Sequence, residues 1–366
     1  MKTEEIVSEL EKLAPLSIQE SWDNSGLQIK SHDENIKSIA LTLDITIDSL
    51  NFAKENNCNL IISHHPLFFS KFKNLSIDSY IGRIIKECFD SKINIVSFHT
   101  NIDAANGGLA DFVSKKLELK NITSLEKKNI KKFKIVTFIP EDYLEKFLQY
   151  FIDKEVSIIG NYKACSFYNS GKGTFYPMAN SSPFIGEKEQ LNKIPEYKLE
   201  FYANELELGN IIKEIYKLHP YEMPAIDVFQ NFFNGNNNKI GFGRGGFLKS
   251  EMNFEKFLEF LSKKLNIKNL RYVKINNNKI KKIAICPGSG MSLIEEVKKF
   301  SPDVYITGDM KYHEAFMIKE QKLFNLVDIG HFESEIFFVE LMNDYLKNKV
   351  DLPIFIYNQK SVFEYF

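Results

Sequence analysis

The sequence predicts an α/β protein built from two strand-helix halves, with an α+β domain inserted between them. Three observations support this fold class. Short apolar runs alternate with helix-patterned segments before residue 126, the same alternation returns after residue 247, and the stretch between follows another order. At 366 residues and 44% hydrophobic composition, the chain is long enough for each part to bury a core of its own.

The N-terminal half, residues 1–126, alternates strands with helices. Each strand is a short apolar run, and each helix has apolar residues three or four positions apart. The predicted order is strand 39–43, helix 46–57, strand 59–63, helix 79–90, strand 93–97 and helix 106–118. Strand, helix, strand is the unit of a parallel sheet, and these strands end at Asp44, His64 and His99.

The C-terminal half, residues 247–366, repeats this logic. The predicted order is a strand and glycine turn at 283–290, a helix, the strand 304–309, a helix over 311–321, the strand 324–330 and a helix that begins just after His331. Polar residues again stand where the strands end.

The intervening stretch, residues 127–246, has a different order of predicted strands and helices. It predicts strand, helix, two or three strands (KACSFY, TFYP and YKLEFYA), helix and strand, the order of a ferredoxin-like α+β domain. Two consecutive domains would leave similar linkers. Because strands and helices alternate in the same way on both sides, we favour an insertion into one domain made of 1–126 and 247–366.

Composition excludes several classes of function. Lys plus Arg (47) nearly equals Asp plus Glu (48), so no overall positive field favours nucleic acid as a partner. The four cysteines have no C-x-x-C spacing, which is typical of reduced thiols in a cytosolic chain. The acidic N-terminus is unlike a signal peptide and no run approaches ~20 apolar residues, so we expect a cytoplasmic protein without membrane spans.

Histidines and carboxylates gather at the predicted strand ends. They are His64 and His65 after the second strand, His99 and Asp103 after the third, and His331 and Glu335 after the last. His331 and Glu335 are four residues apart, so a helix there places them on one face. Because functional groups of open parallel sheets gather beyond the carboxyl ends of the strands, we expect all these side chains to meet.

A mixed imidazole and carboxylate cluster predicts a metal-binding core. Adjacent histidines diverge along an extended backbone, so His64 and His65 serve two ions more easily than they chelate one. Glu335 or Asp103 could bridge such a pair. We therefore predict two divalent metal ions per chain. The donors suit Zn, Fe, Mn or Ni better than Ca or Mg, and no pattern selects among the four.

The motifs that carry these residues resemble one family. SHHPLFF, SFHTNIDAANGG, TGDMKYHEA and GHFESE, with WDNSGLQ near the start, are similar to the Nif-three-like family, also named GTP cyclohydrolase I type 2 homologues. The resemblance covers both halves and implies a dinuclear site, bridged by the last of its ligands, at His64, His65, Asp103, His331 and Glu335. It also implies a ring-shaped homohexamer. HPYEMPAIDVF resembles the signalling-protein-like insertion of longer members.

Other polar residues have plain interpretations beside functional ones. His313 lies in the first turn of a predicted helix. It is a candidate for contacting the substrate or for supporting a metal ligand, as is His99. His219 stands between a helix and a proline, where a structural role is expected. CPGSGM can cradle an anion or simply turn the chain, and WDNSGL can simply cap and turn it.

Two functions from different classes stay open. The first is a dinuclear metal hydrolase acting on a nucleotide, and the family name implies ring opening of GTP. Phosphate-ester or amide hydrolysis would use the same metals, and no guanine-reading motif is visible. The second is a non-catalytic metal-binding or regulatory ring protein whose inserted domain gates the central cavity.

Overall fold

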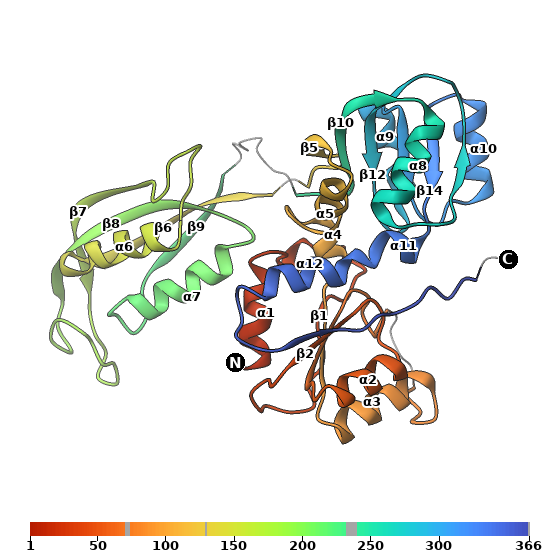
Figure 1. Cartoon of the computed structure of the whole chain (residues 1–366). Helices are drawn as coiled ribbons and strands as arrows, with labels where there is room; N and C mark the ends of the chain where they lie inside the picture. Colours follow the sequence, from red (N-terminus) through yellow and green to blue (C-terminus); the bar gives the residue numbers. More distant parts are fainter. Residues whose placement is uncertain (70–73, 129, 232–239, 365–366) are drawn as a thin grey trace. The chain divides into compact units, whose positions relative to one another are not determined.

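The computed structural model describes residues 1–69, 74–128, 130–231 and 240–364 (Figure 1). It separates the chain into two compact units. The core unit comprises Met1–Lys128 and Lys239–Phe366, and the inserted unit comprises Asn129–Asn238. No helix of the described residues combines the length and the apolar character needed to cross a bilayer.

The first sheet of the core unit has the strand order β1 (Gly26–Ile29), β4 (Asn94–Ser97), β3 (Leu60–Ser63), β2 (Ile39–Thr42) and β15 (Ile354–Ile356). All neighbours are parallel except β1, which is antiparallel to β4. Every residue of β2, β3 and β4 is buried, which explains their continuous apolar runs. Helices α2 (Ile47–Glu55) and α3 (Tyr80–Asp90) close a core around Leu50, Ile61 and Ile84.

The second sheet has the order β11 (Arg271–Val273), β14 (Asn325–Asp328), β13 (Val304–Thr307), β12 (Ile280–Ile285), β10 (Arg244–Met252) and β5 (Lys120–Ser124). Strands β12, β13 and β14 are parallel, and the other three join antiparallel. Strand β10 pairs with both β12 and β5 from Arg244 onward, so the predicted boundary after residue 246 falls inside a strand of the core unit. The two halves of the sequence therefore share this sheet.

The remaining helices of the core unit connect or cover the sheets. They are α1 (Thr3–Glu11), α4 (Thr100–Ala104), α5 (Leu109–Lys116), α8 (Phe254–Leu265), α9 (Ile294–Phe300), α10 (Tyr312–Glu320), α11 (His331–Glu335) and α12 (Phe337–Leu346), with short 3-10 turns at Leu16–Ile18 and Gly290–Leu293. Helix α12 packs against β2 and α5, and α5 packs on β10. Phe338 and Met342 of α12 are fully buried there, so this helix ties the two sheets together.

The parallel strands end in register. Thr42 pairs with Ser63 and Ser63 with Ser97 in the first sheet, and Thr307 pairs with Asp328 in the second. The residues that follow these strands therefore emerge at one edge of each sheet. Those edges carry the histidines of the sequence motifs.

The inserted unit has one antiparallel sheet in the order β7 (Ser166–Phe175), β8 (Asn192–Asn204), β6 (Lys132–Pro140) and β9 (Ile226–Asn231). With α6 (Leu144–Asp153) after β6, behind a 3-10 turn at Glu141–Tyr143, and α7 (Leu208–Leu218) after β8, its elements follow the order β-α-β-β-α-β. KACSFY and TFYP contribute to a single strand, β7. Both helices pack on one face, burying Phe147 and Ile211 against Ile135 and Phe201.

Candidate metal centre

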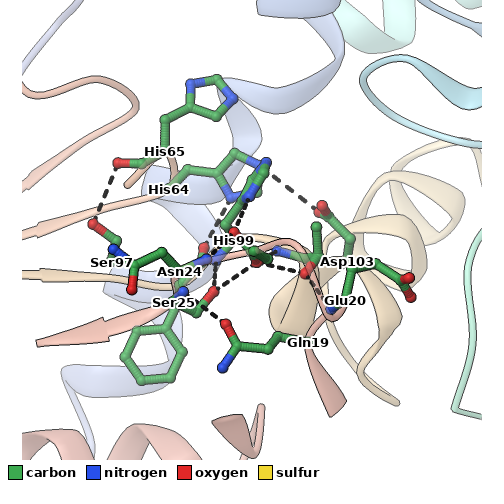
Figure 2. Close-up of polar contacts among 12 residues, drawn as sticks. Gln19, Glu20, Asn24, Ser25, His64, His65, Ser97, His99 and Asp103 are labelled. Carbon is green, nitrogen blue, oxygen red and sulfur yellow. Dashed lines mark hydrogen bonds and ion pairs between the residues drawn. The ribbon is translucent and has the colours of Figure 1, made fainter. Parts of the chain in front are cut away.

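Six donor side chains from the two sheet edges converge in the core unit. They are His64 and His65 after β3, His99 after β4, Asp103 in α4, and His331 and Glu335 at the two ends of α11. Figure 2 shows His64, His65, His99 and Asp103 together. Three overlapping triads have ligand atoms within 4.8 Å of one another: His64, His65 and His99; His65, His331 and Glu335; and His64, Asp103 and Glu335. The structure thus brings together all five predicted metal ligands, and His99 with them.

Glu335 lies between two groups of donors. Its Oε1 atom is 3.7 Å from His64 Nε2, while its Oε2 atom is 3.1 Å from His65 Nε2 and 2.9 Å from His331 Nε2. Asp103 Oδ1 is 3.8 Å from the same His64 nitrogen. Because the two oxygens of Glu335 face different donors, this carboxylate can serve two positions at once.

Every imidazole of the cluster is held from behind through its Nδ1 atom. The acceptors are the Phe98 carbonyl oxygen for His64 (2.9 Å), Asp44 for His65 (2.7 Å), Asp23 for His99 (2.8 Å) and Asp309 for His331 (2.6 Å). An acceptor at Nδ1 keeps the proton on that atom and leaves the lone pair on Nε2. This arrangement is typical of histidines that ligate a metal.

Buried polar atoms of the cluster lack partners within the described residues. His64 Nε2 and Asp103 Oδ1 are buried and make no hydrogen bond there, and Glu335 Oε2 has only the Nε2 atoms of His65 and His331 within reach. A buried polar atom without a partner costs about 1–3 kcal/mol, so His64 Nε2 and Asp103 Oδ1 in one cluster indicate a site for a cation. Imidazole nitrogens with carboxylate oxygens fit a divalent transition metal.

Asp23 belongs to a supporting layer that sequence patterns hid. WDNSGL predicts only a turn, yet the Asp23 carboxylate accepts hydrogen bonds from His99 Nδ1 and from the amide (3.0 Å) and hydroxyl of Thr100. Although burial opposes ionisation, these hydrogen bonds hold the pKa of Asp23 well below its usual value. Asp44 and Asp309 stand at strand ends, which is a signal that sequence analysis could have used. Asp23 carries no comparable signal.

Burial and neighbouring charges perturb the ionisation of the histidines. Burial lowers the pKa of His64 to about 4. Burial also acts downward on His65, but hydrogen bonds to Asp44 and Glu335 raise its pKa to about 10. The hydrogen bond to Glu335 likewise raises the pKa of His331 to about 9. A metal must therefore displace protons from His65 and His331, so binding is favoured as the pH rises.

Two cavities flank the cluster. The larger, of about 740 Å³, has one wall formed by the metal donors and is otherwise lined by residues that include Glu20, Glu126, Glu296, Trp22, Phe69 and Phe242. The smaller, of about 580 Å³, shares His65 and His331 with the first and is lined by the C-terminal segment, including Gln359. The larger cavity thus places acidic and aromatic residues beside the donors.

The turn CPGSGM allows close packing against the cluster. A Cβ at Gly288, whose φ is +66°, would lie 2.1 Å from Glu335 Oε1. The Gly288 amide donates to Ser334 Oγ (2.8 Å), and the Gly290 amide donates to Thr307 Oγ1 (2.9 Å). Because these amides have partners within the protein, the turn makes room for Glu335 and does not present them to an anion.

The two other histidine candidates lie outside the donor triads. His313 is exposed on α10, where its ring contacts Tyr312, and it lines neither cavity beside the cluster. Within the described part of the chain, His313 therefore makes no contact that would let it support this cluster. His219 is buried at the end of α7 and its Nε2 donates to the Phe138 carbonyl oxygen (2.8 Å), as a structural histidine does.

Comparison with known proteins gives consistent results along the whole chain. A family model described as Duf34/NIF3 (NGG1p interacting factor 3) matches residues 1–361. A Staphylococcus epidermidis protein named GTP cyclohydrolase 1 type 2 homolog is 35% identical over 360 residues, covering 98% of this chain and 96% of the relative. A Staphylococcus aureus protein of the same name is 33% identical over 359 residues, with coverage of 97% and 96%. The solved structure of a Bacillus cereus protein related to NIF3 has 30% identity and a TM-score of 0.82, covering 100% of this chain and 99% of that one.

Proposed function

This chain belongs to the Duf34/NIF3 family, and on that basis we propose that its core unit holds a dinuclear metal centre, which hydrolyses a nucleotide. One divalent ion (Zn, Fe, Mn or Ni) would be held by His64, Asp103 and one oxygen of Glu335. The second would be held by His65, His331 and the other oxygen of Glu335. The name of the relatives makes GTP the first substrate to test.

The observation that carries this proposal is the shared orientation of the imidazoles. Each one is held at Nδ1 by an oxygen acceptor, so Nε2 is the atom left to bind. His65 and His331 direct their Nε2 atoms at Glu335, and His64 Nε2 is buried without a hydrogen bond among the described residues, a cost that a purely structural histidine would avoid.

His99 is the residue that we assign to proton transfer. When bound, two divalent ions supply Lewis acidity and make a water nucleophilic near neutral pH. His99 lines the larger cavity, and Asp23 holds its Nδ1 proton, so its Nε2 atom can take a proton from the attacking water. The same atom can then return that proton to the leaving nitrogen or oxygen.

Residues that line the larger cavity beside the donors can hold the base of a nucleotide. Glu20, Glu126 and Glu296 line this cavity, and carboxylates accept hydrogen bonds from N–H groups such as those on the Watson–Crick edge of guanine. Trp22 and Phe242 offer aromatic surface for a planar ring. We therefore propose that the purine ring enters the cavity.

A turnover screen tests the proposal. Protein loaded with Zn²⁺ or Mn²⁺ is incubated with GTP, guanosine and a set of phosphoesters, and products are separated by chromatography. We expect loss of turnover in Glu335→Gln and a reduced rate with two retained metals in His99→Ala. Glu340→Gln, an exposed change on α12, is the matched control. Metal content is measured in every variant, because lost activity with lost metal says nothing about proton transfer.

The second candidate function is a non-catalytic metal-binding or regulatory protein. The inserted unit favours it, because that unit contributes none of the proposed ligands yet has a cavity of its own. Metal-loaded protein that binds nucleotides tightly and turns none over would support this alternative.

The organisation of the whole protein stays a prediction in three respects. We propose that the inserted unit is a ferredoxin-like domain inserted into the metal-binding core. A shortened chain that joins residue 128 to residue 240 through a few glycines should stay soluble and bind metal. A cytoplasmic location and a homohexameric ring are likewise expected, and light scattering on the purified protein tests the latter.

A further inference from the structure

The inserted unit has a cavity on the sheet face that α6 and α7 leave uncovered. It has a volume of about 720 Å³ and lies entirely within that unit, between β7, β8 and the segments 176–185 and 221–225. In β8, Leu199 and Phe201 face the helices, so Glu196 and Lys198 face the cavity side.

Two glycines of β7 give the cavity its floor. Gly171 pairs with Glu196 across the strands, and a Cβ built on Gly171 meets nothing within 4 Å. A Cβ on Gly173 would lie 1.9 Å from Glu196 Oε2, so the carboxylate lies directly over that backbone. Glycine within a strand weakens it and often marks a place where another group approaches the backbone closely. Glu196 approaches the backbone at Gly173, and the space above Gly171 is open to a ligand.

Glu196 is a buried carboxylate with a neutral partner. It is 7% exposed, and the Tyr221 hydroxyl donates to its Oε1 atom at 2.7 Å. Of the other charged residues that line the cavity, Lys198 pairs with Glu200 (2.5 Å) and Glu222 accepts a hydrogen bond from the Ser182 amide (2.8 Å). Lys172 stands between Gly171 and Gly173 in β7, so its side chain leaves the strand on the face opposite to Glu196. A buried carboxylate is costly unless a cation or several donors compensate it. The cavity therefore presents negative charge at its floor.

Aromatic side chains form much of the remaining wall. They are Phe138, Phe175, Tyr176, Phe184 and Tyr221. The ring of Tyr221 is 6.2 Å from that of Phe175 and 6.4 Å from that of Phe184, between centroids. Aromatic faces attract cations, and their apolar surface accommodates an organic body.

We propose that this cavity binds an organic cation, an ammonium group on an aromatic or apolar body. The ammonium donates to Glu196 over the glycine floor, and the apolar body lies against the aromatic wall. This site is separate from the proposed metal chemistry, because none of its lining residues belongs to the core unit. It gives the inserted unit a ligand of its own.

A matched pair of small molecules tests the proposal on the full-length protein. Phenethylamine and 2-phenylethanol share one shape and differ in charge, and their binding is measured by ligand-observed NMR, with and without a chelator. We expect the amine to bind about tenfold more tightly than the alcohol. Glu196→Gln keeps the size of the side chain and should abolish that preference. Glu145→Gln, an exposed change on α6 outside the cavity, should retain it.

A second variant keeps the test decisive if Glu196→Gln does not fold. Gly171 has no positive φ, so Gly171→Trp occupies the space over the floor beside Glu196 without backbone strain and should abolish binding of both molecules. Equal affinity for amine and alcohol, or no detectable binding of either, overturns the proposal. So does a preference for the amine that survives Gly171→Trp or disappears when metal is removed, since each result places the amine elsewhere.

Discussion

We expect Asp44→Asn to weaken the ion that His65, His331 and Glu335 are proposed to hold. Asp44 accepts the His65 Nδ1 hydrogen at 2.7 Å, and Gln359 from the C-terminal segment donates to its other carboxylate oxygen at 2.5 Å. Asparagine keeps the shape of this side chain and removes its charge. The imidazole then becomes a poorer ligand, because its proton is no longer held on Nδ1 by a carboxylate.

The exposure of Asp44 sets the expected magnitude. Loss of such a supporting group typically weakens metal affinity tenfold to a hundredfold, about 1.4–2.8 kcal/mol. The Asp44 side chain is 40% exposed, so solvent screens its charge and we expect a loss near tenfold. The side chain of Asp23, which accepts the His99 Nδ1 hydrogen, is fully buried. Asp23→Asn should therefore have an effect near hundredfold, and on the turnover rate more than on metal content.

Competition with a chromophoric chelator for Zn²⁺ measures both affinities and the number of ions. Gln359→Ala should weaken the same ion by a smaller factor, because Gln359 acts on His65 only through Asp44. Asp48→Asn, a nearby acidic change in the first turn of α2, is the control for charge alone. The reasoning is refuted if Asp44→Asn binds both ions as tightly as the natural protein, or if Asp48→Asn weakens binding equally.

Three further results are expected. Gly288→Ala should lower metal stoichiometry, because its Cβ would lie 2.1 Å from Glu335 Oε1 at a positive φ; two tightly bound ions would contradict this. Arg244→Ala should lower the free energy of unfolding by about 3–5 kcal/mol in urea titrations, since it leaves Asp111 without its buried ion-pair partner at 2.9 Å, and a loss below about 1 kcal/mol would contradict it. Cys165 alone should react quickly with a thiol reagent at mildly alkaline pH, because the other three cysteines are buried; a second fast thiol would count against the described packing.

The sequence by itself determined the residues of the candidate metal centre. His64, His65, His99, Asp103, His331 and Glu335 were all expected to meet by one rule, that polar groups beyond the carboxyl ends of parallel strands gather at a common edge. The family resemblance, and not this rule, named the five predicted ligands among them. The rule works because strand direction and the βαβ connection decide where a strand ends, and both are visible in the alternation of apolar runs. The spacing of His331 and Glu335 is likewise local, since a helix turn places residues four apart on one face.

Only the tertiary structure decided how those residues are used. The hydrogen bond from His99 to Asp23 joins residues 76 positions apart. Glu335 Oε1 faces His64 after β3, while its Oε2 faces both His65 and the distant His331. His313 has a sequence position much like that of His331, yet its side chain is exposed on α10. The cavity over Gly171 depends on a neighbouring strand bringing Glu196 to the same face. Such contacts depend on the register between distant strands and on the direction of each side chain, which no local pattern of residues encodes.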